Sequence, residues 1–176
     1  MLKKILLGIA ALVAVVLIVA AFQPSTFAVS RSTLISAPPS ALFPEVNDLH
    51  RWTAWSPFEK LDPGMQRRFE GAPAGVGAVY AWAGNSQAGT GKMTITESRP
   101  GELIGIKLEF LKPMAAVSQT TFTFQPESGQ TRVTWAMTGT NNYVAKIFCL
   151  FVNMDKVVGG QFEEGLANLK KVAEKK

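Results

Sequence analysis

The feature that most constrains the fold of this 176-residue chain is a series of short segments in which apolar and polar residues alternate. In residues 102–112 every second residue is apolar, at Ile104, Ile106, Leu108 and Phe110. A period of two places these side chains on one face of a β-strand. Segments of this kind predict strands at residues 27–36, 65–70, 78–83, 89–98, 102–112, 116–125 and 131–140. Short glycine- and proline-rich turns follow most of them, which favours an antiparallel sheet with one apolar face.

An apolar sheet face needs a cover, and residues near the C-terminus can supply it. Apolar residues recur there at spacings of three or four, at Val158, Phe162, Leu166, Leu169 and Ala173. This pattern predicts an amphipathic helix of about 20 residues. Two short helices are expected after the first strand, one at residues 40–46 and one that starts near residue 48 and ends at Pro57. The expected class is α+β, with a curved antiparallel sheet of about seven strands wrapped on a long C-terminal helix.

Residues 5–22 contain no charged or strongly polar side chain. As a helix of about 18 residues they would reach roughly 27 Å, close to the thickness of the bilayer hydrocarbon core. Lys3 and Lys4 precede them and no basic residue follows before Arg31. The positive-inside rule therefore predicts a single-pass anchor in the cell (inner) membrane, with the N-terminus cytoplasmic and the rest periplasmic or otherwise extracytoplasmic.

A cleavable signal peptide is the alternative to this anchor, with Val19-Ala20-Ala21 as a cleavage site. Signal peptides usually have a shorter apolar core, of about 7–15 residues, so the length of the run favours retention. We therefore expect a membrane anchor with a short tether at residues 1–26 and one domain at residues 27–176.

Composition argues against several classes of function. The net charge is +5, but lysines gather at the two ends of the chain and no nucleic-acid motif occurs, so no nucleic-acid partner is expected. Cys149 is the only cysteine and His50 the only histidine, which excludes an internal disulfide and argues against a metal site. The glycine-rich residues 71–77 and 84–92 lack the spacing of nucleotide-binding loops and are expected to be turns. No cofactor is expected.

Several motifs resemble the SRPBCC superfamily, the helix-grip fold of START lipid-transfer domains and of polyketide cyclase/dehydrase-like proteins. They are Ala37-Pro38-Pro39, residues 48–57 (DLHRWTAWSP) with Asp62-Pro63, Gly75-Val76-Gly77 before Trp82, and the tail at residues 154–170. The resemblance covers residues 27–173. It implies a cavity between the sheet and the long helix that holds a hydrophobic small molecule or lipid, for carriage, sensing or envelope maintenance.

The candidate ligand-lining residues are the apolar residues expected to face this cavity. They are Trp52, Trp55, Phe58, Tyr80, Trp82, Met93, Ile95, Ile104, Ile106, Leu108, Phe110, Phe122, Trp135, Met137, Phe162 and Leu166. Trp52 and Trp55 would lie at the cavity mouth, where an aromatic ring can either line a pocket or plug it.

Two other functions use the same fold. A cyclase-like or hydrolase-like enzyme would need a buried ionisable residue, whereas the expected inward positions are almost all apolar. His50, Arg51, Glu59 and Asp62 fall near the mouth, and spacing alone pairs none of them. No catalytic residue is therefore assigned. A protein-interaction module with a collapsed cavity is the third possibility.

Residues 143–154 are apolar nearly all round but too few to span a bilayer. They could be buried against the sheet edge before the long helix. Alternatively they form an exposed patch that dips into the outer face of the membrane, with Phe148, Leu150 and Phe151 as the contact residues.

Overall fold

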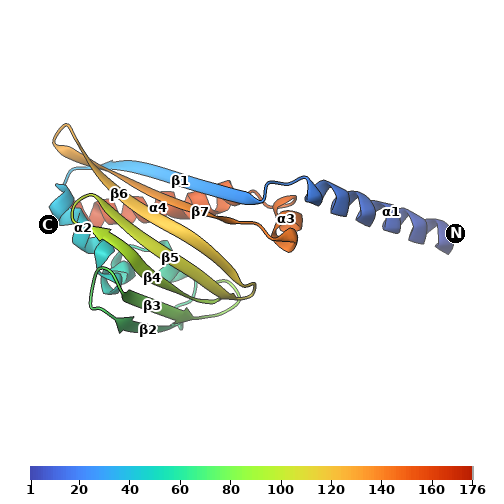
Figure 1. Cartoon of the computed structure of the whole chain (residues 1–176), viewed down its shortest axis with the longest axis horizontal. Coiled ribbons are helices and arrows are strands. Elements are labelled where there is room, and N and C mark those ends of the chain that lie inside the picture. Colours follow the sequence, from blue (N-terminus) through green and yellow to red (C-terminus); the bar gives the residue numbers. More distant parts are fainter. Residues whose placement is uncertain (176) are drawn as a thin grey trace.

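A computed structural model describes residues 1–175, and its elements follow the expected order (Figure 1). The strands are β1 (Thr26–Ile35), β2 (Gln66–Gly71), β3 (Ala78–Ala83), β4 (Thr90–Arg99), β5 (Leu103–Lys112), β6 (Ala116–Glu127) and β7 (Gln130–Thr140). The helices are α1 (Leu2–Ala21), α2 (Pro39–Asn47), α3 (Tyr143–Cys149) and α4 (Met154–Glu174). Two 3₁₀ helices, η1 (Leu49–Ala54) and η2 (Pro57–Lys60), lie between α2 and β2.

The seven strands form one antiparallel sheet in the order β1-β7-β6-β5-β4-β3-β2. The first strand of the chain pairs with the last, from Thr26 opposite Thr140 to Ile35 opposite Thr131, so β1 forms one edge of the sheet. A register shift between Ile95 and Glu97 interrupts the β4–β5 ladder, and irregularities of this kind bend a strand. The predicted α+β helix-grip fold is confirmed.

The tryptophan-bearing stretch differs in detail from the single short helix that was predicted. It forms η1 and η2, which are separated at Trp55 and Ser56. Asp48 begins η1, since its carboxylate accepts the backbone N–H of His50 at 3.0 Å. Proline at the first position of η2 suits a helix start, because its missing N–H would have no helical partner there.

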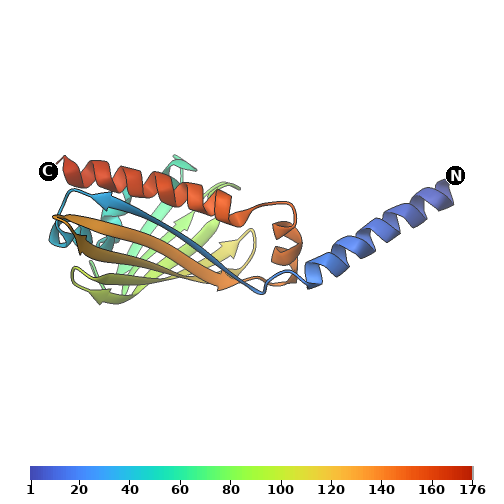
Figure 2. The same cartoon turned by 90° about the horizontal axis from the view of Figure 1, so that it is seen from above.

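Helix α4 lies across one face of the sheet, as Figure 2 shows. Its buried side includes Phe162, Leu166, Leu169 and Ala173, which confirms the predicted amphipathic stripe. Gly165 allows close approach to the sheet, because a Cβ atom there would lie 2.6 Å from Cζ3 of Trp135.

Ion pairs fix the first half of α4 to strand β1. Arg31, on the inner face of β1, donates to both carboxylate oxygens of Asp155 at 2.9 and 3.0 Å and to Oε1 of Glu163 at 2.6 Å. These bonds and the two negative charges raise the pKa of Arg31, and the same hydrogen bonds lower the pKa of Asp155. The first turns of α4 are therefore held mainly by charge. Beyond Phe162, apolar burial adds to hydrogen bonds with the end of β1, such as that from Lys170 to the Leu34 carbonyl oxygen at 3.0 Å.

Helix α1 extends away from the domain, with only Ala20 buried among its residues (Figures 1 and 2). Its mean hydropathy is 2.8 over a window of spanning length, so it is long and apolar enough to cross a membrane. A signal sequence would share these properties.

Helix α3 packs against the end of α1, where the Tyr143 hydroxyl donates to the Leu17 carbonyl oxygen at 2.6 Å. None of its residues is buried, so the expectation that residues 143–154 are covered by the sheet edge is wrong for α3. Its contacts are instead with α1, which lies next to it at this end of the domain.

Candidate functional site

The predicted lining residues come together between the sheet and α4. Those that are buried are Trp52, Trp55, Tyr80, Met93, Ile95, Ile104, Ile106, Phe122, Trp135, Met137, Phe162 and Leu166. The half-buried ones are Phe58, Trp82, Leu108 and Phe110. Strands β3 to β7 present those at positions 80–137 on the inner face, because the alternation keeps every second side chain on that side, and the others come from η1, η2 and α4 or lie next to them.

One half of this interior is filled by aromatic rings around Trp135. Its ring stacks on Phe162 with centroids 4.1 Å apart and lies 4.7 Å from Phe122. Trp52 and Trp55 meet it edge-on at 6.0 and 5.7 Å. Their indole N–H groups are satisfied by the carbonyls of Val46 and Glu45 at 2.9 and 3.0 Å. Because the rings pack on one another, this half of the interior is filled by side chains of the protein itself.

The other half lies toward α3 and is packed less completely. Leu108 and Phe110 on β5 and Trp82 on β3 are only half-buried, while Met93, which pairs with Leu108, is buried. Met137 on β7 is buried as well. Methionine is unbranched and has a polarisable sulfur, so it adapts to neighbours of different shape. This half has the apolar character of a small-molecule site.

Two hydroxyl side chains on β6 also face this half, and sequence reasoning missed them. Ser118 and Thr120 are buried, in the same alternating series as Phe122. Thr120 Oγ1 is one of two buried side-chain polar atoms without a hydrogen-bond partner within residues 1–175, and the indole Nε1 of Trp135 is the other. The signal was available, since both residues lie an even number of positions before Phe122.

Two surface clefts flank the molecule. The larger, of about 510 Å³, lies at the ends of β1, β6 and β7 nearest α1, and is lined by residues 26–28, 117–119 and 138–140. Phe27, Ser118 and Gly139 in its lining belong to the inward-facing series. The smaller, of about 230 Å³, lies between η1–η2 and the last turns of α4 and is lined by polar residues such as Glu59, Lys60 and Asn168.

A buried charged cluster closes the β2–β3 side of the interior. Glu59, whose side chain is 9% exposed, accepts the Tyr80 hydroxyl and the Arg67 Nε–H, each at 2.6 Å. Burial, and next the hydrogen bond to Glu59, raise the pKa of Tyr80 above its ordinary value. Sequence spacing did not pair Glu59 because its partners lie 8 and 21 residues away.

The other polar residues near the predicted mouth form structural pairs. Arg51 donates to the buried Glu45 at 2.8 Å. The ring of His50 stacks on Phe69 at 4.1 Å, and its Nδ1 lies 3.0 Å from an Asp48 oxygen. Asp62 accepts the backbone N–H of Asn85 at 2.7 Å and so ties η2 to the β3–β4 turn. Within residues 1–175 no group of three His, Cys, Asp or Glu side chains could hold a metal ion.

Comparisons with known proteins agree with this fold. A sequence model of the family described as polyketide cyclase / dehydrase and lipid transport matches residues 26–174. No functionally curated protein matches the chain.

Solved structures share the fold at low sequence identity. Protein CV1439 from Chromobacterium violaceum is 18% identical, with a TM-score of 0.60 over 86% of this chain and 99% of its own. The Aha1 dimer from Colwellia psychrerythraea is 13% identical, with a TM-score of 0.60 over 84% and 96%. The di-domain ARO/CYC StfQ from the steffimycin biosynthetic pathway is 11% identical, with a TM-score of 0.65 over 86% and 51%.

Proposed function

Because the chain belongs to the polyketide cyclase / dehydrase and lipid transport family, we propose that it is a membrane-anchored, extracytoplasmic domain that binds a hydrophobic small molecule or lipid. The ligand lies between the sheet and α4, in the half of the interior nearest α3. The observation that carries this proposal is the half-buried apolar wall of Leu108, Phe110 and Trp82 beside the buried Met93. The aromatic half around Trp135 forms the closed end of the site.

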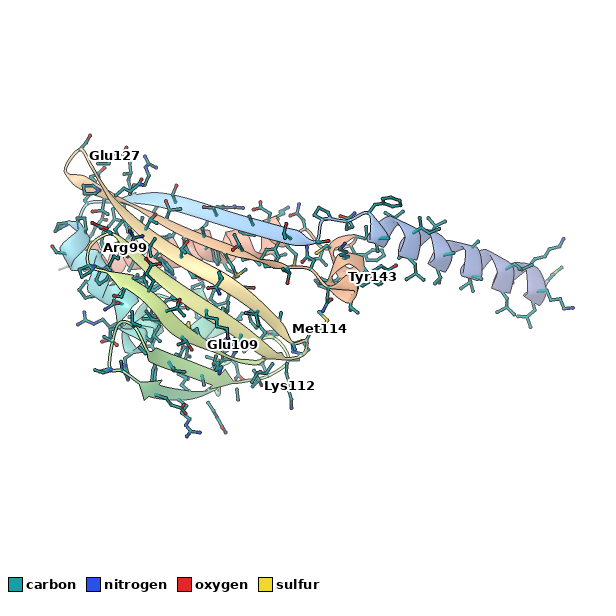
Figure 3. The ribbon with its side chains drawn as sticks, in the orientation of Figure 1. Arg99, Glu109, Lys112, Met114, Glu127 and Tyr143 are labelled. Carbon is teal, nitrogen blue, oxygen red and sulfur yellow. The ribbon has the colours of Figure 1, made fainter. Side chains whose placement is uncertain are left out.

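The anchor places the open half of the domain next to the bilayer. Tyr143 of α3 and Met114 of the β5–β6 turn lie at the end of the domain nearest α1, and Glu127 lies at the opposite end (Figure 3). If α1 spans the membrane, its bond from Tyr143 to Leu17 holds α3 at the level of the last turns of the span. Phe148 and Phe151 are 50% and 74% exposed there. With Leu150 they form the membrane contact, and ligand passes between bilayer and site at this end.

Native mass spectrometry of the full chain tests ligand binding directly. The protein is purified from its own host in detergent, and bound molecules are extracted with organic solvent and identified. We expect one hydrophobic molecule per chain, lost in Leu108→Asp and kept in the matched variant Lys107→Asn, since residue 107 lies on the opposite face of β5. Near-ultraviolet circular dichroism checks that both variants stay folded. A folded but empty wild-type chain would contradict the proposal and favour the protein-interaction module.

The membrane contact is tested by labelling Cys149, the only cysteine of the chain. A fluorophore on Cys149 in nanodiscs with head-group quenchers should be quenched, and the double variant Phe148→Glu/Phe151→Glu should relieve that quenching. The control carries the label at the far end, as Cys149→Ser/Glu127→Cys. Equal quenching at both positions would show that the domain does not rest on the bilayer through α3.

A catalytic role for the same interior is the second candidate, because the buried Glu59–Tyr80 pair provides a carboxylate in contact with a hydroxyl group. A cyclase-like or hydrolase-like enzyme could use them for proton transfer. The extracted ligand distinguishes the two functions. A binding protein returns it unchanged after incubation, whereas an enzyme converts it and Glu59→Gln abolishes the conversion.

A further inference from the structure

Two unsatisfied polar atoms lie on neighbouring strands of the proposed ligand site. Trp135 on β7 is 2% exposed and Thr120 on β6 is 5% exposed. Among the residues that the structure describes, 1–175, neither the indole Nε1 of Trp135 nor the Oγ1 of Thr120 has a hydrogen-bond partner. The register pairs Thr120 with Met137 and Phe122 with Trp135, so Thr120 and Trp135 are diagonal neighbours on the inner face. Diagonal neighbours lie about 7–8 Å apart, within reach of one small polar group held between an indole and a hydroxyl.

Leaving these atoms unsatisfied is unfavourable, and the chain has simple ways to avoid it. Buried polar atoms without partners destabilise a fold, and buried tryptophan N–H groups usually bond to something. In Trp52 and Trp55, which touch the same cluster, carbonyl oxygens satisfy both N–H groups. A valine at 120 would fill a similar volume with no polar atom. The two exceptions therefore mark a place where a polar partner from outside the chain is expected.

From this geometry we infer that Trp135 and Thr120 are the hydrogen-bonding end of the ligand site, and that the ligand is an uncharged amphiphile with a carbonyl or hydroxyl oxygen. The inference rests on the proposed ligand-binding function and names the class of ligand. Trp135 can only donate a hydrogen bond, and Thr120 can donate or accept one, so the shared partner must offer an acceptor oxygen. The hydrocarbon part extends over Leu108 and Phe110 toward α3.

The ligand is uncharged because residues 1–175 offer this site no available counter-charge. Arg31 stands opposite Trp135 in the β1–β7 register, but Asp155 and Glu163 already engage its guanidinium. On the β2–β3 side, Arg67 is paired with Glu59. A carboxylate or phosphate placed between two neutral donors would lose its hydration without gaining a cation, which costs far more than burying a ketone or an alcohol.

Ser118 extends the polar line toward the surface. It lies two residues before Thr120 on the same face of β6 and also lines the cleft of about 510 Å³ at the α1 end of the sheet. A polar group that enters through this cleft meets Ser118 first and Thr120 next. The cleft is therefore the entrance to the site.

Matched probes of equal chain length test the assignment. The full chain in phospholipid nanodiscs is titrated with 2-dodecanone, dodecanoate and dodecane. We expect the ketone to bind roughly three- to tenfold more tightly than the alkane, the range for one net hydrogen bond, and the charged dodecanoate to bind more weakly than the ketone. With a ¹³C-labelled carbonyl, the infrared stretch of bound ketone should move to lower frequency.

Trp135→Phe and Thr120→Val should each reduce the ketone preference and move the carbonyl stretch back, while Thr121→Val on the outer face changes neither. Thr120→Val should also raise the melting temperature of the empty protein, because it removes an unsatisfied hydroxyl at nearly constant volume. The melting temperature is compared for Thr120→Val alone, because Trp135→Phe leaves a void beside Phe162.

Three results would overturn the inference. If ketone and alkane bind equally and the variants change nothing, the site binds hydrophobic molecules without polar recognition, and the proposed function stands alone. If Thr120→Val lowers the melting temperature of the empty protein, its hydroxyl has a structural partner within the fold. If none of the probes binds, the ligand-binding function fails and the assignment with it.

Discussion

The contact between α4 and Trp135 can be tested by adding one methyl group. At Gly165 a new Cβ atom would lie 2.6 Å from Cζ3 of Trp135 and 3.0 Å from Cδ of Pro57. The indole cannot easily move away, because Phe162 stacks on it at 4.1 Å and Phe122 lies 4.7 Å away. Gly165→Ala must therefore shift either the helix or the aromatic cluster.

The expected effect is the difference between two opposing terms. Overpacking a well-filled core costs about 1–3 kcal/mol. Replacing glycine by alanine inside a helix gains about 1 kcal/mol. Gly165→Ala should thus lower the free energy of unfolding by roughly 0–2 kcal/mol. At Gly160, on the same helix, no atom of residues 1–175 outside the neighbouring helix backbone lies within 4 Å of the added methyl group, so Gly160→Ala should raise the free energy of unfolding by about 1 kcal/mol.

Thermal unfolding of the two full-length variants in detergent, followed by near-ultraviolet circular dichroism, measures the difference. The two should be separated by about 1–3 kcal/mol, and each kcal/mol corresponds to about 2–4 °C for a chain of this length. All four tryptophans belong to the domain, so the signal reports its aromatic packing. If Gly165→Ala is as stabilising as Gly160→Ala, α4 does not rest on Trp135 and the filled half of the interior is not rigid.

Two further predictions concern charged groups. The folded pKa of Asp155 lies below its unfolded value, so the stability it contributes is complete above about pH 4 and is lost as pH falls through the lowered value. Between about pH 2 and 6 the melting temperature should therefore change less with pH for Asp155→Asn than for wild type. The folded pKa of Tyr80 is raised, so its contribution is complete below about pH 10 and lost as pH rises further, which Tyr80→Phe should abolish. Tyr80→Phe should also cost about 1–3 kcal/mol at neutral pH, because it removes a hydrogen bond to the buried Glu59, and an unchanged midpoint in urea would argue against that bond.

Much of the fold was predictable because it follows from two periodicities. Alternation of period two located all seven strands to within two residues, and spacings of three and four located α4. The stretch around Trp52 was predicted less well. Its 3₁₀ helices depend on local capping by Asp48 and on the placement of Pro57, which carry no long periodic signal. The exposure of α3 follows from its packing against α1, which the local sequence pattern does not reveal.

The candidate site was harder to predict because its polar features are non-local. Glu59 meets Arg67 and Tyr80 only after η2 folds onto β2 and β3. Thr120 could have been placed on the inner face by parity with Phe122, but its missing partner is a property of the packed structure. Apolar positions follow a pattern along the chain, whereas hydrogen-bond satisfaction depends on the three-dimensional neighbours.

The forces that hold α4 change along its length in a way that matters for ligand entry. Its first half is fixed to β1 by Asp155 and Glu163, whose side chains are largely exposed, and exposed ion pairs contribute little to stability because water and salt screen them. Its second half buries Phe162, Leu166 and Leu169, each of which contributes about 1.5–3 kcal/mol. If the helix must move to admit a ligand, its first half therefore yields at lower cost. That half lies at the α3 end of the domain, which is the end that the proposed membrane anchor would hold closest to the bilayer (Figure 3).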